Sequence, residues 1–185
     1  MTGLIILAIV VAAIGYGIFL YNDLVSKRQL TNEGWSGIDV QLKRRTDLIP
    51  NLLETVKGYM GHERETLEAV TNARAAAQAG SNAGPEERAK LEGALSGALG
   101  RLLAVAEAYP DLKANTTFLE FQEALQAVED EIQLSRRYYN GAVRNLNVAV
   151  ESFPSTVIAN AFKFEKAEYF ELENEADRAV PSVKF

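Results

Sequence analysis

The amino terminus carries the longest uninterrupted apolar run of the chain. Residues 3–21 read GLIILAIVVAAIGYGIFLY, nineteen positions without a charged side chain. As an α-helix at ~1.5 Å per residue, this run spans roughly 28 Å, close to the hydrocarbon thickness of a bilayer. Tyr16, Phe19 and Tyr21 lie toward its far end, where aromatic side chains gather at a membrane interface. The pattern predicts a transmembrane anchor at residues 1–21 that contacts the lipid bilayer through residues 3–21.

A cleaved signal peptide is the alternative interpretation of this run. The segment has no Lys or Arg before the apolar residues and no A-x-A cleavage site before Asn22 and Asp23, and its apolar run is longer than a usual signal-peptide core. These features favour a retained anchor.

The flanking charges predict the orientation of the anchor. Residues 1–21 contain no Lys or Arg, whereas Lys27 and Arg28 follow closely. The positive-inside rule therefore predicts an amino terminus outside and the bulk of the chain in the cytoplasm. Within the run, Ala13 and Gly17 are small residues four apart, a spacing that permits helix association. A lipid-facing helix with no partner is the alternative.

Beyond the anchor, apolar side chains recur at alternating steps of three and four. In the first stretch this period runs from Trp35 to about Ala79, with no turn signal separating it from the apolar run. Pro50 lies inside the pattern, where we expect a kink, and Gly58 and Gly61 weaken the helix locally. The pattern predicts one long helix that leaves the bilayer without a break.

Two further helices and a tail follow. Residues 80–85 (GSNAGP) form the clearest loop of the chain, and Pro85 suits a first helical turn. A second helix then ends near Tyr109. A third helix runs from a capping box at Thr117 and Glu120 to about residue 153. The tail beyond it is aromatic and predicts a short helix followed by an irregular return.

Three long amphipathic helices joined by short loops predict an all-α fold, with a coiled-coil-like antiparallel bundle over residues 22–185. By length the first helix spans roughly 90 Å beyond the membrane, against roughly 37 and 55 Å for the second and third. The shorter helices cannot cover all of the first. Trp35 and Ile38 therefore stay uncovered unless the tail or a second copy buries them, which predicts a homo-oligomer or a membrane-protein partner.

Composition excludes several classes of function. With no Cys and a single His, the chain lacks thiolate metal sites, cysteine nucleophiles and the usual base of a Ser–His–Asp triad. A net charge of −6 argues against a nucleic-acid partner, which requires a basic surface. No glycine-rich phosphate loop is present. We therefore predict no enzyme activity, no catalytic, cofactor-binding or metal-binding residues, no cofactor and no small-molecule substrate.

Two sequence fragments resemble catalytic motifs without completing them. His62-Glu63 begins like a zinc-protease helix, but Thr66 stands where the second His is needed. We interpret His62 as a histidine on a helix surface. Ser36 lies between glycines without the spacing of a nucleophile elbow.

The charged side chains of the helices have two interpretations. Lys43-Arg44-Arg45 lies roughly 33 Å beyond the bilayer edge on a continuous helix, too far to contact lipid headgroups. We favour pairing within the bundle, with residues 129–131 (EDE) as the expected partners, over contact with a partner protein. Arg45 interrupts the apolar seam and needs a carboxylate partner if buried. If it serves only such a pair, Arg45→Leu should keep or raise thermal stability.

Other polar side chains could bind ligands or simply face solvent. A metal site from side-chain oxygens of the first helix is the less favoured interpretation of Asp39, Asp47, Asn51 and Glu54. Asn140 and Asn147 lie one heptad apart, a spacing at which buried amides fix helix register. The tail acids are expected to form a solvated face: Glu165, Glu168, Glu171, Glu173 and Glu175.

These residues carry a long and specific similarity to a known family. The sequence closely resembles the LemA family from the anchor to the carboxyl terminus, in the segments 35–59, 62–63, 66–68, 103–115, 136–140, 153–154 and 181–185. The resemblance implies a single-pass protein of the bacterial inner membrane with a cytoplasmic helical bundle and no established activity. It also implies a link to magnetosome membranes and to membrane metallopeptidases.

Three classes of function follow from these observations. The leading prediction is a self-associating membrane scaffold or interaction protein, in membrane organisation or envelope quality control. A regulator or adaptor of a membrane metallopeptidase is the alternative. A hydrolase or lipid-modifying enzyme is the third class and the least favoured.

Overall fold

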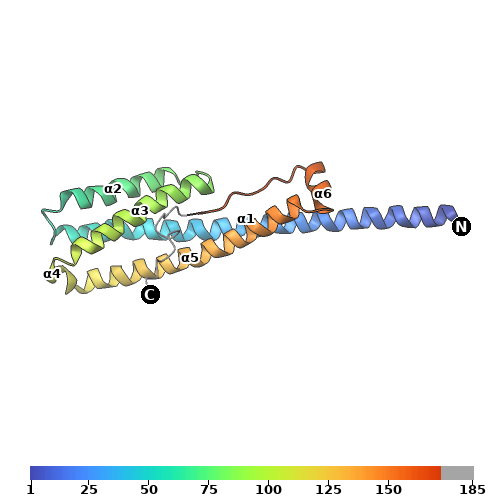
Figure 1. Cartoon of the computed structure of the whole chain (residues 1–185). Coiled ribbons are helices and arrows are strands. Elements are labelled where there is room, and N and C mark those ends of the chain that lie inside the picture. The colour runs from blue at the N-terminus through green and yellow to red at the C-terminus, as the bar shows by residue number, and fades with distance from the viewer. Residues whose placement is uncertain (172–185) are drawn as a thin grey trace, which may run out of the picture. The chain divides into compact units, whose positions relative to one another are not determined.

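A computed structural model gives the fold of the protein and describes residues 1–171 (Figure 1). Over these residues the chain is helical with no strand, which confirms the predicted all-α class. The helices, in chain order, are α1 (Thr2–Lys57), α2 (Arg64–Ala79), α3 (Pro85–Ala106), α4 (Pro110–Lys113), α5 (Thr116–Glu151) and α6 (Ser155–Ala161).

The chain folds into two compact units, and α1 and α5 each contribute to both. Unit 1 comprises residues 1–37 and 135–169, and unit 2 comprises residues 38–134 together with Phe170 and Glu171 of the described chain. The division expected from sequence, an anchor at 1–21 and one bundle at 22–185, stays a prediction.

The apolar run continues into the following helix without a break, as its sequence predicts. α1 is helical from Thr2 to Lys57 with Pro50 inside it. Within unit 1, the first turns of α1 have no other described segment of that unit beside them (Figure 1). Their apolar side chains are accordingly exposed, for example Leu4 at 73% and Ile9 at 63%.

The predicted extension of the first helix to Ala79 is wrong. α1 ends at Lys57, and α2 begins at Arg64 after a turn that contains Gly58 and Gly61. Two glycines within four positions raise the entropic cost of a helix, and Met60 between them is fully buried, so the chain turns there. The turn lets α2 fold back and pack along α3.

Unit 2 is therefore built from four long helix segments rather than three, with short α4 between α3 and α5. A single apolar core joins α1, α2, α3 and α5, with Leu52, Val70, Leu102 and Phe118 all fully buried. Burial of one such side chain contributes about 1.5–3 kcal/mol to folding.

The helix ends follow their local chemistry. The loop at 80–84 and the start of α3 at Pro85 are confirmed. The amino-terminal cap of α5 is Asn115, whose Oδ1 accepts a hydrogen bond from the backbone N–H of Phe118 at 3.0 Å, so the capping box predicted at Thr117 lies two residues too late. Short α6 and the irregular segment after it confirm the predicted tail.

The uncovered surface expected at Trp35 and Ile38 is absent. Ile38 is fully buried, and Trp35 packs against Tyr139 of α5 with ring centroids 5.4 Å apart. The argument for self-association that depended on these two side chains therefore fails.

In unit 1, α1 and α5 approach closely at a glycine. A Cβ on Gly34 would lie 3.0 Å from the Cα of Tyr139, whereas a Cβ on Gly37 would meet nothing within 4 Å. The return segment after α6 is bound to α5 by Asn147, whose side chain pairs with the backbone N–H and carbonyl of Ala167 at 2.8 and 2.9 Å. Of the two amides expected to fix register, Asn147 therefore holds this segment.

Candidate functional site

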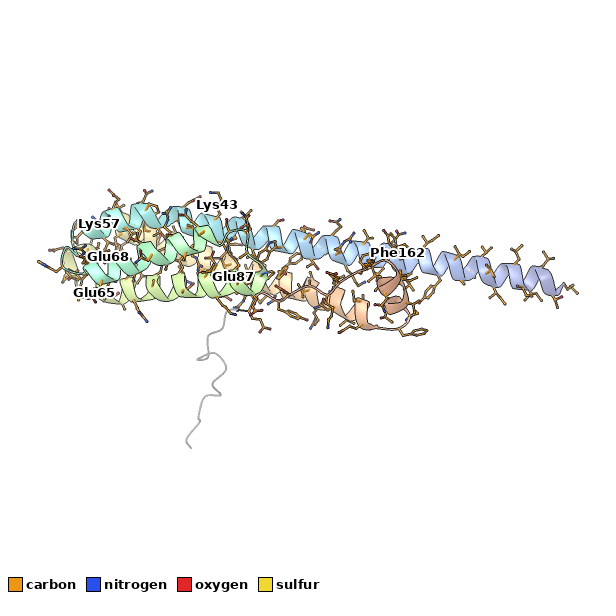
Figure 2. The ribbon with its side chains drawn as sticks, turned by 90° about the horizontal axis from the view of Figure 1, so that it is seen from above. Lys43, Lys57, Glu65, Glu68, Glu87 and Phe162 are labelled. Carbon is orange, nitrogen blue, oxygen red and sulfur yellow. The ribbon has the colours of Figure 1, made fainter. Side chains whose placement is uncertain are left out.

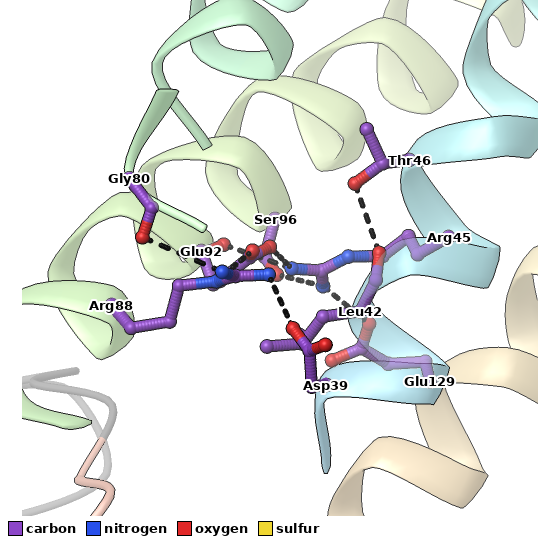
Figure 3. A network of polar contacts seen from close by, with 9 residues as sticks. All are labelled: Asp39, Leu42, Arg45, Thr46, Gly80, Arg88, Glu92, Ser96 and Glu129. Atoms are coloured by element: carbon purple, nitrogen blue, oxygen red, sulfur yellow. Dashed lines mark hydrogen bonds and ion pairs between the residues drawn. The ribbon is translucent and has the colours of Figure 1, made fainter. Parts of the chain in front are cut away.

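The most highly organised polar site of the described chain lies inside unit 2 (Figure 3). Six side chains from α1, α3 and α5 form it, and they are named here the Arg45 network: Asp39, Arg45, Arg88, Glu92, Ser96 and Glu129.

Arg45 is the centre of the network and is only 2% exposed. Its Nη2 donates to Oε2 of Glu92 at 2.6 Å and to the Glu92 carbonyl at 3.2 Å. Its Nη1 donates to Oε2 of Glu129 at 2.8 Å and to Oγ of Ser96 at 2.7 Å. The predicted carboxylate partner of Arg45 and the predicted link to Glu129 are both confirmed.

Arg88 holds the other side of the same carboxylate. Its Nε donates to Oε1 of Glu92 at 2.9 Å, so the two oxygens of Glu92 each accept from a different guanidinium. The remaining nitrogens of Arg88 reach Oδ1 of Asp39 at 3.3 Å and the carbonyl of Gly80 at 3.4 Å. Glu92 is 1% exposed, so this ion pair is shielded from water.

Every charged group of the network lies in an ion pair. Two guanidinium groups face three carboxylates, and the two carboxylates at its edges, Asp39 and Glu129, keep side-chain exposures of 52% and 34%. A buried charge is tolerated only when it is paired and hydrogen-bonded, and here every charged group has a partner of opposite sign. The arrangement binds α1, α3 and α5 to one another in a single register.

A cleft of about 280 Å³ opens beside the network, and Asp39, Lys43, Asp47 and Arg88 lie along it. Its carboxylates are already paired with cations, because Lys43 donates to Asp47 at 3.1 Å and Arg88 to Asp39. Among residues 1–171 no three His, Cys, Asp or Glu side chains come together to hold a metal ion. Asn51 and Glu54 face solvent.

The sequence fragments that resemble catalytic motifs fall elsewhere. His62 lies exposed in the turn between α1 and α2 rather than on a helix surface. The hydroxyl of Ser36 donates to the Asn32 carbonyl of its own helix at 3.1 Å. Glu63 accepts a hydrogen bond from the Tyr109 hydroxyl at 3.1 Å, and this bond to a carboxylate raises the pKa of Tyr109.

The surface of unit 2 carries charges of both signs. Figure 2 shows Lys43, Lys57, Glu65, Glu68 and Glu87 on it, and all five are exposed. Of the tail acids, Glu165, Glu168 and Glu171 are exposed as expected. Glu173 and Glu175 lie outside the described residues, as does the segment 181–185.

The sequence pattern missed Glu92, Arg88 and Ser96. The buried positions of α3 include Glu92, Leu95, Leu99, Leu102 and Ala106. Glu92, Leu99 and Ala106 are spaced by seven residues, which is the one sequence pattern that could have indicated burial of Glu92. A glutamate at such a position is nevertheless expected to face solvent unless an arginine is known to lie opposite it.

In unit 1 a buried polar side chain of α5 binds the backbone of the segment that follows α6. The hydroxyl of Tyr139 donates to the carbonyl of Glu168 at 2.8 Å. Burial and, to a smaller degree, the nearby Glu168 carboxylate raise the pKa of Tyr139 to about 12.

A helical bundle with an internally paired charged centre and an apolar amino-terminal helix defines the class of this protein. In the described chain, α1 alone is long and apolar enough to cross a membrane, and no residue of its most apolar stretch is buried by the described residues. The sequence matches the LemA family over residues 34–185. The chain belongs to the LemA family, which confirms the resemblance seen in its sequence.

Three relatives are similar to this protein over most of its chain. The magnetosome protein MamQ 2 of Paramagnetospirillum magneticum is 27% identical over 195 aligned residues, covering 92% of this chain and 72% of that protein. The magnetosome protein MamQ of Magnetospirillum gryphiswaldense is 24% identical over 87% of this chain and 65% of that protein. Protein LemA of Metamycoplasma hominis is 28% identical over 80% of this chain and 69% of that protein. A match over 92% of this chain must include part of the apolar segment 3–21.

Proposed function

We propose that this protein is a membrane-anchored, non-catalytic scaffold of the bacterial inner membrane, with its amino terminus outside and its helical bundle in the cytoplasm. One observation carries the proposal: no residue in the most apolar stretch of α1 is buried by the described part of the chain. An uncovered apolar helix of this length is stable in lipid and unstable in water.

The Arg45 network supports a structural rather than a catalytic role for the bundle. Catalysis requires a group that is free to exchange a proton or attack a substrate, whereas Arg45, Arg88 and Glu92 are committed to one another. None of the relatives' names quoted above states an enzymatic activity. Presentation of a rigid bundle surface to partners fits both observations.

We propose in addition that this scaffold assembles by self-association. Exposed apolar side chains are present on the described surface of unit 1 away from the span, among them Val148 at 56% and Tyr138 at 50%. A homo-oligomer or a membrane-protein partner would cover such positions. Because some relatives are named as magnetosome proteins, we propose membrane organisation as the process that the scaffold serves.

The anchor is tested with the full-length protein in bacterial membranes. The variant Ile9→Asp/Val11→Asp places two carboxylates near the middle of the span, where each costs about 2.5–3.5 kcal/mol on insertion. We expect the wild type to stay in the membrane pellet after alkaline carbonate extraction and the variant to be released. The matched control, Leu134→Asp/Val148→Asp, alters two exposed apolar residues outside the span and should stay in the pellet. Release of the wild type would refute the anchor.

Orientation and assembly are read separately. Because the natural chain has no cysteine, Thr2→Cys and Glu65→Cys each provide one labelling site. A membrane-impermeant maleimide should label Thr2→Cys in cells with a permeabilised outer membrane, and Glu65→Cys only after lysis. The reverse pattern would overturn the orientation. A monomeric mass in mild detergent, with no partner recovered by cross-linking, would exclude the scaffold.

A further inference from the structure

The chain turns back after α5, and this turn (residues 153–162, which include α6) lies against the part of α1 that we assign to the bilayer. The Ile158 side chain of α6 approaches Gly17, where an added Cβ would lie 3.8 Å from Ile158 Cδ1. The Phe162 ring meets the Tyr21 ring edge-on with centroids 4.8 Å apart. Gly17, one of the small residues expected to associate with another helix, thus faces α6 of its own chain.

These contacts border an apolar groove. Its volume is about 350 Å³, and its lining comprises Ile14, Gly17, Ile18, Tyr21, Ile158 and Phe162. Because all six residues belong to unit 1, the groove is a feature of that unit alone.

The outer surface of the same turn is apolar and uncovered. Phe153 is 82% exposed, Val157 57% and Phe162 60%. Figure 2 shows Phe162 beside α1, where the chain turns back. Large apolar side chains gathered on one surface mark a binding site for a partner or a membrane.

The depth of the turn decides between these occupants. Residues 14–21 are the last two helical turns of the span, so Ile158 and Phe162 lie up to about 10 Å inside its end. A protein that covered Val157 and Phe162 would have to enter the bilayer beside α1, whereas lipid acyl chains already occupy this depth. Acyl chains are therefore the occupant that we infer.

The backbone of the turn suits a site with little water. Ser155 is buried, and its hydroxyl lies 2.6 Å from the Ala149 carbonyl and 2.9 Å from the Ser152 carbonyl, two groups at the end of α5. The backbone N–H groups of Phe162 and Phe164 donate to Ile158 and Ala159 at 3.0 and 2.9 Å. Satisfied backbone groups are the condition for entering hydrocarbon.

Cationic side chains lie next to the end of the turn, near the Phe164 ring. Arg28 of α1 lies over the Phe164 ring at 4.9 Å from its centroid, and Lys163 and Lys166 flank that ring in sequence. Lys166 pairs with Glu151 at 2.7 Å. Aromatic and cationic side chains at one level are typical of the lipid headgroup region.

We propose that the turn Phe153–Phe162 is a second membrane contact, inserted into the acyl-chain boundary of the same leaflet that α1 leaves. The inference rests on the proposed anchor and adds a lipid-binding surface to it. Two points of attachment prevent unit 1 from rotating about the axis of α1. The proposed ligand is the acyl chain of a phospholipid, held against the groove between α1 and α6.

The test measures the depth of single fluorophores in the full-length protein, reconstituted in phosphatidylethanolamine and phosphatidylglycerol vesicles. Three variants carry the label: Val157→Cys in the turn, Val148→Cys on α5 and Ile9→Cys in the span. Val157 and Val148 are matched in residue type and exposure, at 57% and 56%. Lipids brominated near the headgroup end of the acyl chain quench only fluorophores that contact hydrocarbon at that depth.

We expect brominated lipid to quench the label at 157 several-fold more strongly than the label at 148, with aqueous iodide showing the opposite preference. Equal lipid quenching at the two positions would overturn the proposal. Protection of position 157 from both quenchers would also overturn it, because protein would then cover the turn. A label at Phe162→Cys repeats the measurement in case the probe at 157 distorts α6.

The label at Ile9 separates the two hypotheses. Deep-brominated lipid should quench it if α1 spans the bilayer. Quenching at 9 without quenching at 157 refutes only the second contact, whereas no quenching at 9 refutes the anchor on which the inference depends.

Discussion

The two units of this protein differ in where their energetically unfavourable side chains lie: unit 2 buries charged ones, and unit 1 exposes apolar ones. Unit 2 encloses three charged side chains in ion pairs, Arg45, Arg88 and Glu92, in its interior. Unit 1 leaves large apolar side chains on its outside, with Phe153 at 82% exposure and Leu4 at 73%. A buried charge and an exposed apolar side chain each destabilise a folded protein in water unless other interactions compensate.

The difference shows where each unit obtains that compensation. In unit 2, hydrogen bonds and opposite charges from α1, α3 and α5 provide it. In unit 1 the described chain provides none for these exposed apolar side chains, and the proposed lipid contacts would supply it. Variants can test this comparison one unit at a time.

The largest effect is expected from Glu92→Gln, which keeps the size of the side chain and removes its charge. Arg45 and Arg88 then lose their shared carboxylate in a buried site, and breaking a buried pair costs about 3–5 kcal/mol. The measurement is the free energy of unfolding of the full-length protein in detergent, from urea denaturation followed by circular dichroism. Glu86→Gln is the matched control, because it breaks an exposed pair with Lys90 on the same helix and should leave the midpoint unchanged.

Next in size is the recovery expected when the charged groups are removed together. The variant Arg45→Met/Arg88→Met/Glu92→Leu replaces the buried charges with apolar groups, and such replacements are often neutral or stabilising by about 1–4 kcal/mol. Asp39 and Glu129 keep enough exposure to be hydrated without their partners. A triple variant as unstable as Glu92→Gln would show that the network contributes more than charge compensation.

The network also changes the expectation for Arg45→Leu alone. From sequence, this variant should keep or raise thermal stability if Arg45 serves one pair only. In the structure, Oε2 of Glu92 accepts its bond from Arg45, and Glu92 stays buried when the arginine is gone. We now expect a lower melting temperature for the single variant, and an unchanged one would contradict the shared-carboxylate account.

A smaller effect tests the contact between α1 and α5 in unit 1. Gly34→Ala inserts a methyl group 3.0 Å from the Cα of Tyr139, backbone that cannot move without separating the helices, and we expect a loss of about 1 kcal/mol. Gly37→Ala, three residues along the same helix, meets open space and should gain about 0.5–1 kcal/mol from helix propensity. Equal shifts for the two alanines would mean that the close approach is absent.

The smallest effect is a dependence on alkaline pH in unit 1. The Tyr139 pKa rises from 10.0 to about 12 in the folded chain, so the folded state retains a proton that the unfolded state releases. The stability that depends on this proton is complete below pH 10 and is lost as the pH rises toward about 12. Fluorescence of Trp35, the single tryptophan, reports unfolding beside this ring. Tyr139→Phe should show a weaker decline across this window, and an identical decline would assign the effect to other groups.

Much of the fold follows from the sequence because its signals are local. Helical periodicity, the loop at 80–84, Pro85 at a helix start and the apolar run each depend on residues close together in the chain. The errors arose where local signals conflicted. The period continued across Gly58 and Gly61, so the sequence favoured one helix, whereas the chain turns and uses Met60 to close the core.

The site was only partly predictable, for a different reason. Arg45 stood out because a charge on an apolar seam must have a partner, and the chemistry of that partner was clear. Glu92 could not be identified, because a glutamate carries no mark of burial until the two arginines are placed around it. Such a residue is selected by neighbours 47 positions away in the chain, as for Arg45 and Glu92.

By itself, the sequence determined that this protein is helical, that its first helix is long and apolar enough to cross a membrane, and that it belongs to the LemA family. It also determined that Arg45 needs an acidic partner. Only the tertiary structure decided that Glu92 is shared between two arginines, that Trp35 packs on Tyr139 while Ile38 is buried, and that α6 returns to α1. Periodicity and hydropathy are sums over neighbouring residues, whereas a pairing or a covered surface depends on which distant segments meet in space.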